Sequence, residues 1–520
     1  MDNKQQFIDK INEGYSFKGD SIILGGAMLD GECQHETFVK IPLKTMNRHG
    51  LIAGATGTGK TKTLQILAEQ LSRKSVPVLL MDIKGDLSGV AAESPGHPKI
   101  YERHDAMGLH FEAGASSVEF LSLSEEPGLR LRATVSEFGP VLFSKILGLN
   151  DTQSGIVAVV FKYCDDNDIP LLDLKDFKKT LNYLLNEGKK EIEADYGRLS
   201  SASAGAIIRR MIEIETQGAD KFFGERSFDV DDLTRIDENG YGMISILRLT
   251  DLQDRPKLFS TFMLQLLAEI YANFDEQGDD DRPRLVLFID EAHLVFNEAS
   301  DALLDQIETI VKLIRSKGVG IYFCTQNPVD IPNEVLSQLG LKIQHALRAF
   351  TAKDRKAIKQ ASENYPETEF YTIDELITQL GIGEAFVTVL NEKGIPTPLV
   401  HCLLRAPISR MDILTDNEIK AILRKSKLID HYNKEVDRKS AYEILTEKIE
   451  YAKKEETRQE REEQEKKERK TSRRREKSTL EKIMNSSAAR QVGRTMAREL
   501  TRGLLGALGV SSTKRRRKRR

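Results

Sequence analysis

The 520-residue chain contains only four cysteines, and no two of them form a Cys-x-x-Cys pair. They stand far apart in the sequence, at Cys33, Cys164, Cys324 and Cys402. This spacing excludes the common zinc clusters and the disulfide framework of a small secreted domain. It is typical of a protein in a reducing compartment.

The sequence also lacks a long apolar run. No stretch approaches the ~20 apolar residues that a membrane-spanning helix needs. The first residues, MDNKQQFIDKINEGYSF, lack the apolar core of a signal peptide. The sequence therefore predicts a soluble cytoplasmic protein.

The net charge is close to zero, at −3, but the charged residues are unevenly distributed along the chain. Residues 450–520 hold 24 lysines and arginines against 11 aspartates and glutamates, whereas the rest of the chain holds 53 against 69. The sequence therefore predicts an acidic body followed by a basic arm.

The body shows several regions. Between residues 46 and 410, short apolar segments alternate with amphipathic ones, which is typical of a parallel sheet covered by helices. A helical pattern at about 130–235 predicts an insertion within this α/β core. Residues 1–45 contain two strand-like segments and are expected to form a short N-terminal β flap. Residues 411–450 are expected to form C-terminal helices.

The arm, residues 451–520, has two parts. Residues 451–477 are almost all charged with mixed signs, which predicts a solvated single helix or a disordered linker. Residues 484–508 predict a helix with an apolar stripe and an arginine stripe on roughly opposite sides. The stripes comprise Met484, Ala488, Val492, Met496, Leu500, Leu504 and Leu508, and Arg490, Arg494, Arg498 and Arg502. Seven consecutive basic residues follow, 514–520.

The segment GATGTGKT matches the P-loop pattern G-x-x-x-x-G-K-[ST] in full, between a strand-like and a helix-like segment. Its backbone N–H groups and the following helix N-terminus are expected to bind the phosphates of ATP. The predicted nucleotide-binding residues are Gly54, Ala55, Thr56, Gly57, Thr58, Gly59, Lys60, Thr61 and Lys62. We expect Lys60 to reach the β- and γ-phosphates and the Thr61 hydroxyl to bind Mg²⁺.

The segment LVLFIDE ends an apolar strand-like run in two carboxylates. Asp290 is expected to hold Mg²⁺, mostly through its water shell, and Glu291 to activate the attacking water. A catalytic glutamate favours hydrolysis over a nucleotide switch. The string DEAH also occurs in superfamily 2 helicases, but their other motifs are not found in this sequence. His293 is therefore predicted to pack against the site or to support it from outside.

The segment VGIYFCTQNP ends another strand-like run in polar residues. Gln326 in this segment is predicted to sense the γ-phosphate and to relay hydrolysis to partner-binding loops. The alternative is an ordinary turn at the end of a strand.

Phosphoryl transfer also favours an arginine at the γ-phosphate. Arg315 is predicted to supply it to the site of a neighbouring subunit, because it lies at the far end of the helix that follows Glu291. A helix C-terminal arginine that meets the helix dipole is the alternative. Arg48 and Arg348 are the other candidates for this role.

The segment LLMDIKGD places a polar cluster after a further strand-like run, which again indicates the catalytic edge of the sheet. Asp82 in this cluster either supports the metal shell or caps a turn.

Taken in order, NRHGLIAGATGTGKT, LLMDIKGD, LVLFIDEAH and RSKGVGIYFCTQNP resemble the HerA/FtsK group of RecA-like ring motors, over roughly residues 20–405. Within this group the chain looks most like the bacterial HerA-like family typified by YjgR, which has a similar IPL…NRHG opening and a stretch like SEFGPVLFSKILGLN. The resemblance implies a RecA-like α/β core, use of ATP and Mg²⁺, and a hexameric ring with an arginine finger across the subunit boundary.

For HerA proper, the resemblance also implies translocation on double-stranded DNA beside an end-resection nuclease. HerA proper docks its nuclease through an N-terminal β-barrel, and the roughly 45 residues before the P-loop strand are too few for a comparable domain. A nuclease partner is therefore left open.

Two functions remain in competition. An ATP-driven DNA translocase or helicase fits the motor motifs and the basic arm, because lysines and arginines neutralise DNA phosphates. A membrane-surface or protein-directed hexameric ATPase fits the two stripes, with residues 484–520 on an anionic bilayer. The arm is also compatible with a partner-binding helix that helps assembly.

Overall fold

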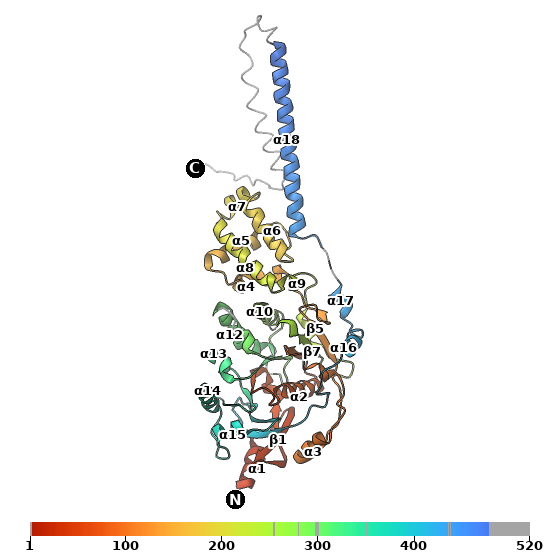
Figure 1. Cartoon of the computed structure of the whole chain (residues 1–520), viewed down its shortest axis with the longest axis vertical. Helices are drawn as coiled ribbons and strands as arrows, with labels where there is room; N and C mark the ends of the chain where they lie inside the picture. Colours follow the sequence, from red (N-terminus) through yellow and green to blue (C-terminus); the bar gives the residue numbers. More distant parts are fainter. Residues whose placement is uncertain are drawn as a thin grey trace, which may run out of the picture. The chain divides into compact units, whose positions relative to one another are not determined.

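The computed structural model describes residues 3–252, 255–278, 280–296, 301–349, 351–434, 436 and 438–477 (Figure 1). The chain divides into two compact units, Met1–Thr446 and Glu447–Arg520. The predicted apolar and arginine stripes at 484–508 and the basic run 514–520 lie outside the described residues.

The first unit is built on one twelve-stranded sheet with the order β2-β1-β12-β11-β10-β3-β9-β8-β4-β7-β5-β6. Its strands are β1 (Ser21–Leu29), β2 (Glu32–Pro42), β3 (Gly50–Ala53), β4 (Val78–Asp82), β5 (Val118–Ser122), β6 (Leu129–Arg130), β7 (Ile244–Arg248), β8 (Leu285–Ile289), β9 (Val319–Thr325), β10 (Leu341–Gln344), β11 (Glu384–Thr388) and β12 (Val400–Leu404).

The helices of this unit precede, connect and follow the strands. They are α1 (Asn3–Gly14), α2 (Lys60–Arg73), α3 (Pro98–Met107), α4 (Val135–Ile146), α5 (Asp151–Asp166), α6 (Leu174–Leu185), α7 (Lys189–Asp195), α8 (Ser201–Thr216), α9 (Ala219–Phe222), α10 (Pro256–Asn273), α11 (His293–Phe296), α12 (Asp301–Ile314), α13 (Asn333–Leu336), α14 (Ala352–Ser362), α15 (Ile373–Gln379), α16 (Asp416–Leu423) and α17 (Ile429–Asn433). The last helix, α18 (Ala441–Lys477), continues into the second unit.

The strands from β10 to β6 are parallel, and the central ones are buried along their whole length. This explains why their sequences are continuously apolar rather than alternating. Strand β3 leads into the P-loop, and β8 leads into the acidic segment. Strand β9, which follows the acidic segment in the chain, lies between them in the sheet. This order confirms the predicted RecA-like α/β class.

The N-terminal segments expected as a flap form β1 and β2, which pair antiparallel with each other. Strand β1 also pairs with β12, so the hairpin forms one edge of the main sheet. Helix α1 precedes it and buries Phe7 and Ile11.

Helices α4 to α9 lie in the chain between β6 and β7, in the region that the sequence assigned to a helical insertion. Their packing rests on aromatic side chains, with Phe143 contacting both Phe161 and Phe177. Phe222 packs edge-to-face against Phe262 of α10, which joins the insertion to the α/β core.

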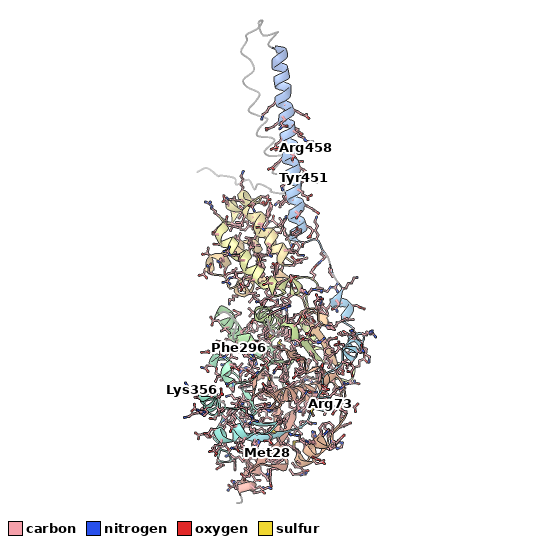
Figure 2. All side chains as sticks on the ribbon, viewed as in Figure 1. Met28, Arg73, Phe296, Lys356, Tyr451 and Arg458 are labelled. Carbon is pink, nitrogen blue, oxygen red and sulfur yellow. The ribbon has the colours of Figure 1, made fainter. Side chains whose placement is uncertain are left out.

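Helix α18 covers the charged segment 451–477. Residues 453–477 include no hydrophobic residue, so this part offers no apolar stripe for packing. Arg458, labelled in Figure 2, pairs with Glu462 one turn further on at 3.3 Å. Such pairs support a solvated helix. In the described part of the chain, no helix has the length and apolar content that crossing a bilayer requires.

Candidate functional site

Four neighbouring strands end together at the edge of the sheet that carries the P-loop. Ala53 of β3 lies opposite Thr325 of β9, and Phe323 of β9 lies opposite Ile289 of β8. Ile289 in turn lies opposite Met81 of β4. The residues that follow these strands are therefore neighbours in space although they come from distant parts of the sequence.

The P-loop has the backbone that its glycines permit. Gly54, Gly57 and Gly59 all have positive φ, at 155°, 78° and 112°. A side chain at Gly54 would meet Cβ of His345 at 2.5 Å. Gly59 caps α2 without a side-chain hydrogen bond, so the helix N-terminus is left for an external anion.

Lys60 is buried and folds back onto the loop. Its Nζ donates hydrogen bonds to the carbonyl oxygens of Gly54 at 2.6 Å and Ala55 at 3.1 Å. Burial lowers the pKa of this lysine, with a further decrease from the nearby charge of Lys84. A phosphate at this position would supply the negative charge that the loop carbonyls do not.

Thr61 and Asp290 are the predicted Mg²⁺ residues. The Thr61 hydroxyl donates to Asp86 Oδ2 at 3.1 Å. Asp290 is 2% exposed, and its Oδ2 has no hydrogen-bond partner. Burial raises the pKa of Asp290, and the charge of Glu291 raises it further. A divalent cation would relieve both effects, so these oxygens fit Mg²⁺.

Asp86 was not assigned a role from the sequence. One of its oxygens accepts the Thr61 hydroxyl, and the other, Oδ1, is buried without a hydrogen-bond partner. Through its contact with Thr61, it is a candidate for a further oxygen donor to the metal. Its place in the polar end of LLMDIKGD, in the turn that follows β4, was the available signal.

Asp82 caps a turn, which is one of the two roles considered for it. Its carboxylate accepts the backbone N–H groups of Gly85 at 2.7 Å and of Asp86 and Leu87 at 3.1 Å each. Burial raises the pKa of Asp82 to about 7 although these N–H groups oppose the shift. The turn fixes the backbone that carries Lys84 and Asp86.

Glu291 is buried and surrounded by polar groups from three segments. The Lys84 ammonium pairs with its Oε1. His293 Nδ1 lies 3.2 Å from its Oε2, and Gln326 Nε2 donates to the same oxygen at 3.5 Å. Glu291 itself has a positive φ of 46°, a backbone conformation that is costly for a residue with a side chain.

Gln326 is thus brought to Glu291, and its loop is held firmly. Thr325 Oγ1 donates to Asp330 Oδ2 at 2.7 Å, and the N–H of Asn327 donates to the same carboxylate oxygen at 3.2 Å. His293, predicted to pack against the site or to support it from outside, lies beside Glu291. Lys84 is a further site residue to which the sequence assigned no role.

The three candidate arginines lie at two different edges of the sheet. Arg48 ends the 3₁₀ turn Leu43–Arg48 before β3, and Arg315 begins the turn Arg315–Lys317 before β9. Both are therefore at the amino ends of the strands, away from the P-loop of their own chain. Arg348 follows β10 on the P-loop side, where it donates to the Thr378 carbonyl oxygen at 2.5 Å.

A cavity of about 510 Å³ adjoins the start of α2. Its lining is mainly apolar and includes Ile66, Ile100, Ile382, Leu404, Ala406 and Met411. Lys62 and Thr63 of α2 line it too. Arg103 holds one wall by donating to the carbonyl oxygens of Ile382, Gly383 and Leu404 at 3.0–3.1 Å. The cavity has the size and character of a nucleoside site.

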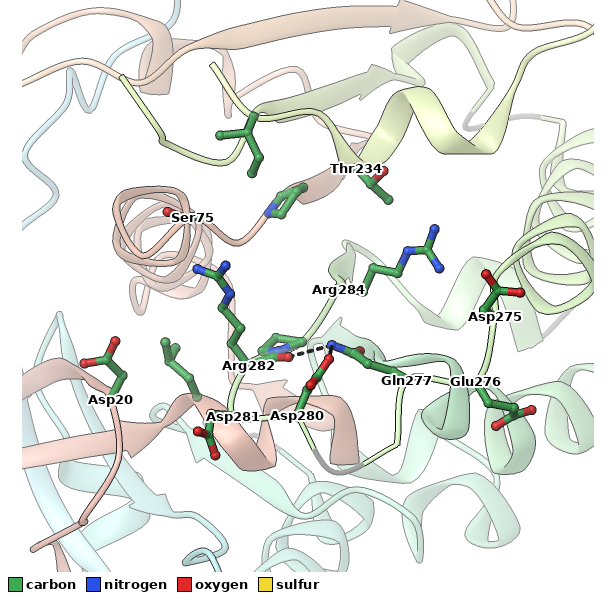
Figure 3. A pocket seen from close by; sticks show the side chains of 14 residues that line it. Asp20, Ser75, Thr234, Asp275, Glu276, Gln277, Asp280, Asp281, Arg282 and Arg284 are labelled. Carbon is green, nitrogen blue, oxygen red and sulfur yellow. Dashed lines mark hydrogen bonds between the residues drawn. The ribbon is translucent and has the colours of Figure 1, made fainter. Parts of the chain in front are cut away.

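A second cavity of about 830 Å³ lies at the amino ends of β4 and β8, the opposite edge of the sheet (Figure 3). Three of its acidic lining residues have basic partners: Lys74 for Asp20 at 3.3 Å, Lys44 for Asp281 at 3.5 Å and Lys317 for Glu276 at 3.1 Å. Gln277 donates to Asp280 at 2.8 Å within it. It contains none of the predicted site residues.

A family comparison fits this arrangement. The model of the family described as Helicase HerA-like C-terminal matches residues 28–516. The chain belongs to the HerA-like family. The sequence-based assignment to the HerA/FtsK group is confirmed, and the fold and family together make the chain a P-loop NTPase.

Individual HerA-like relatives are distant. The DNA double-strand break repair helicase HerA of Sulfolobus acidocaldarius is 22% identical over 379 residues, which are 69% of this chain and 66% of that protein. The probable HerA helicase of Methanocaldococcus jannaschii is 23% identical over 386 residues, 66% of this chain and 69% of that protein. The chain thus spans slightly less than two thirds of the length of the Sulfolobus relative.

Among solved structures, the bacterial conjugative coupling protein TrwB, in its unbound form, aligns with a TM-score of 0.49 at 14% identity. The alignment covers 78% of this chain and 94% of that structure.

Proposed function

We propose that this HerA-like chain hydrolyses ATP and uses the energy to move DNA. The observation that carries the proposal is that Lys60, the first residue of α2, lies close to Glu291 and Gln326, which follow β8 and β9. A P-loop lysine, a buried carboxylate and a polar strand-end residue form the minimal set for binding a triphosphate, activating water and detecting the γ-phosphate. Family membership supports the same reaction.

In the proposed reaction, different residues of the chain bind the phosphates, accept the proton and orient the reacting groups. The α2 N-terminus and the backbone of Gly54–Thr61 bind the phosphates, and Lys60 moves from the loop carbonyls to the β- and γ-phosphates. Glu291 accepts the proton of the attacking water, and Gln326 orients that water or the γ-phosphate. Thr61, Asp290 and Asp86 would hold Mg²⁺, which would supply positive charge to stabilise the charge of the transferring phosphoryl group.

The nucleoside is proposed to occupy the apolar cavity beside α2, between Ile382 and Met411. Lys62 lies on the side of this cavity next to the P-loop. Its Nζ donates to the Met411 carbonyl oxygen at 2.5 Å. The segment that carries Met411 therefore closes the nucleotide site from the C-terminal side.

A hexameric ring is the proposed assembly. Arg315 and Arg48, at the edge of the sheet away from their own P-loop, are placed suitably for donation to a neighbouring subunit. The four cysteines are free thiols, which supports a reducing compartment such as the cytoplasm.

DNA is the proposed cargo because Sulfolobus and Methanocaldococcus HerA proteins are named DNA double-strand break repair helicases. The basic arm supports the same cargo through its charge. A nuclease partner is not part of the proposal. The alternative, an ATPase at an anionic membrane surface, depends on residues 484–520 alone.

The decisive measurement is the ATPase rate of the full-length protein with and without double-stranded DNA, single-stranded DNA and RNA. We expect DNA to raise the ATPase rate. This stimulation should become weaker as the salt concentration increases, because contacts with DNA phosphates release counterions. A rate that no DNA changes would contradict the DNA motor. Sedimentation with anionic liposomes that is lost on deleting residues 484–520 would support the membrane alternative.

Two variants separate the catalytic step from binding. Lys60→Ala is expected to lose ATP binding or turnover, whereas Glu291→Gln keeps binding and loses turnover. Normal hydrolysis by Glu291→Gln would show that another group activates the water.

A further inference from the structure

The two carboxylate oxygens of Glu291 have different neighbours: Oε1 is in ion-pair contact with Lys84 but accepts no hydrogen bond, and Oε2 faces His293 and Gln326. The Lys84 ammonium pairs with Oε1, while His293 and Gln326 approach Oε2 at 3.2 and 3.5 Å. The side chain of Glu291 is only 6% exposed. The Lys84 ammonium lies directly against Oε1, so the attacking water gains access to this oxygen more easily once Lys84 has moved away.

Lys84 is the partner with room to move. Its side chain is 36% exposed, against 27% for His293, and it is a flexible four-carbon chain that follows the turn capped by Asp82. Gln326, by comparison, belongs to a loop anchored through Asp330.

The surroundings of Lys84 already contain a second ammonium. The charge of Lys84 lowers the pKa of Lys60, so the two groups are close enough to repel each other. The carboxylates of Glu291 and Asp290 balance Lys84 in the described structure. A triphosphate bound to the P-loop adds negative charge between the two lysines, and ADP adds less of it because it lacks the γ-phosphate.

We propose that Lys84 is a γ-phosphate ligand that exchanges Glu291 for the bound triphosphate. With ADP, or without nucleotide, Lys84 stays on Oε1 of Glu291 and holds the base. With ATP, the ammonium moves to a γ-phosphate oxygen and Oε1 becomes free to accept the proton of water. Activation of Glu291 as the base thereby depends on the presence of the γ-phosphate. The inference rests on the proposed ATPase function.

The first test measures equilibrium binding of ADP and of the non-hydrolysable analogue AMPPNP to full-length Lys84→Ala. Loss of one charge-assisted hydrogen bond predicts about tenfold weaker AMPPNP binding. Binding of ADP should change by less than about twofold, because ADP does not offer the oxygen to which Lys84 moves. Lys356→Ala, on the exposed face of α14 (Figure 2), is the matched control.

The second test is a double-mutant cycle with Glu291→Gln. The glutamine removes the negative charge that competes for Lys84, so Glu291→Gln should strengthen AMPPNP binding. Part of that gain comes from removing a nearby negative charge and does not require Lys84. The gain should therefore be at least about threefold larger with Lys84 present than in the Lys84→Ala background.

Equal weakening of ADP and AMPPNP by Lys84→Ala, or additive effects in the cycle, would overturn the exchange and leave Lys84 a structural ion-pair partner. Failure of the ATPase proposal is recognised separately. In that case the wild-type protein binds neither nucleotide in a Lys60-dependent manner.

Discussion

The buried carboxylate of Glu69 on α2 accepts the backbone N–H of Ser409 at 3.1 Å, and the Ser409 hydroxyl donates to the same carboxylate. The N–H of Ile408 donates to its other oxygen at 2.9 Å. The helix that begins at the P-loop is therefore fixed to the segment that leads towards α16. Because Met411 of that segment lines the nucleoside cavity, Glu69 joins the two walls of the site.

Replacing Glu69 should loosen this wall. Glu69→Gln retains one acceptor but presents an NH₂ group to a backbone N–H, so we expect a loss of about 1–3 kcal/mol in the free energy of unfolding. Nucleotide affinity should fall with it. Urea unfolding and ADP binding measure the two effects, with exposed Glu102→Gln on α3 as a control. An unchanged affinity for ADP would show that the segment around Ser409 does not form part of the nucleotide site.

The same substitution should change the pH dependence of stability. Burial raises the pKa of Glu69, against the lowering effect of the Ser409 hydroxyl. A raised pKa means that the folded protein holds this proton more tightly than the unfolded chain. Its contribution to stability is complete below the ordinary glutamate pKa of about 4.3 and declines as pH rises through the folded value. The stability advantage of wild type over Glu69→Gln should therefore shrink with increasing pH.

The sequence predicted the class of the fold and the centre of the site because both depend on local signals. A P-loop is recognisable since Gly59 and Lys60 must be neighbours in the chain, and Asp290 and Glu291 directly follow an apolar strand. Because the carboxyl ends of parallel strands lie at the same edge of a sheet, the residues that follow them become neighbours without any further sequence signal.

The remaining features depend on contacts between distant segments. Lys84 reaches Glu291 only because β4 pairs with β8, and nothing in LLMDIKGD specifies that neighbour. The nucleoside cavity likewise combines α2 and α3 with residues near Ile382 and Met411. The N-terminal hairpin has an ordinary strand pattern, and its place in the main sheet follows from pairing with β12.

Asp86 should affect the metal requirement. Asp86→Asn keeps an acceptor for the Thr61 hydroxyl but removes a negative charge from the candidate Mg²⁺ site. We expect the Mg²⁺ concentration for half-maximal ATPase activity to rise several-fold, and the maximal rate to be largely recovered at high Mg²⁺. Exposed Asp105→Asn on α3 provides the comparison. An unchanged Mg²⁺ requirement would restrict Asp86 to shaping the turn.

The nucleoside cavity predicts weak discrimination between bases. The area that its lining exposes is mainly apolar, which favours packing against a base over hydrogen bonds to the base edge. We expect ATP and GTP to be hydrolysed with kcat/KM values within about tenfold of each other. Ile382→Asp, at a side chain that is 73% exposed, should raise KM for both nucleotides with little change in kcat. Strict ATP selectivity would place the base elsewhere.

The trans arginine can be assigned with mixed rings. Arg315 and Arg48 lie at the amino ends of β9 and β3, so neither reaches the P-loop of its own chain. We expect Arg315→Ala to lower kcat by about 10³-fold or more, as loss of an arginine at the γ-phosphate does. Nucleotide binding should change little. Mixing Arg315→Ala with Lys60→Ala subunits should restore activity, because Lys60→Ala subunits donate an intact arginine to neighbours with an intact P-loop. If the mixture stays inactive while Arg48→Ala or Arg348→Ala is rescued in the same assay, that arginine acts across the boundary.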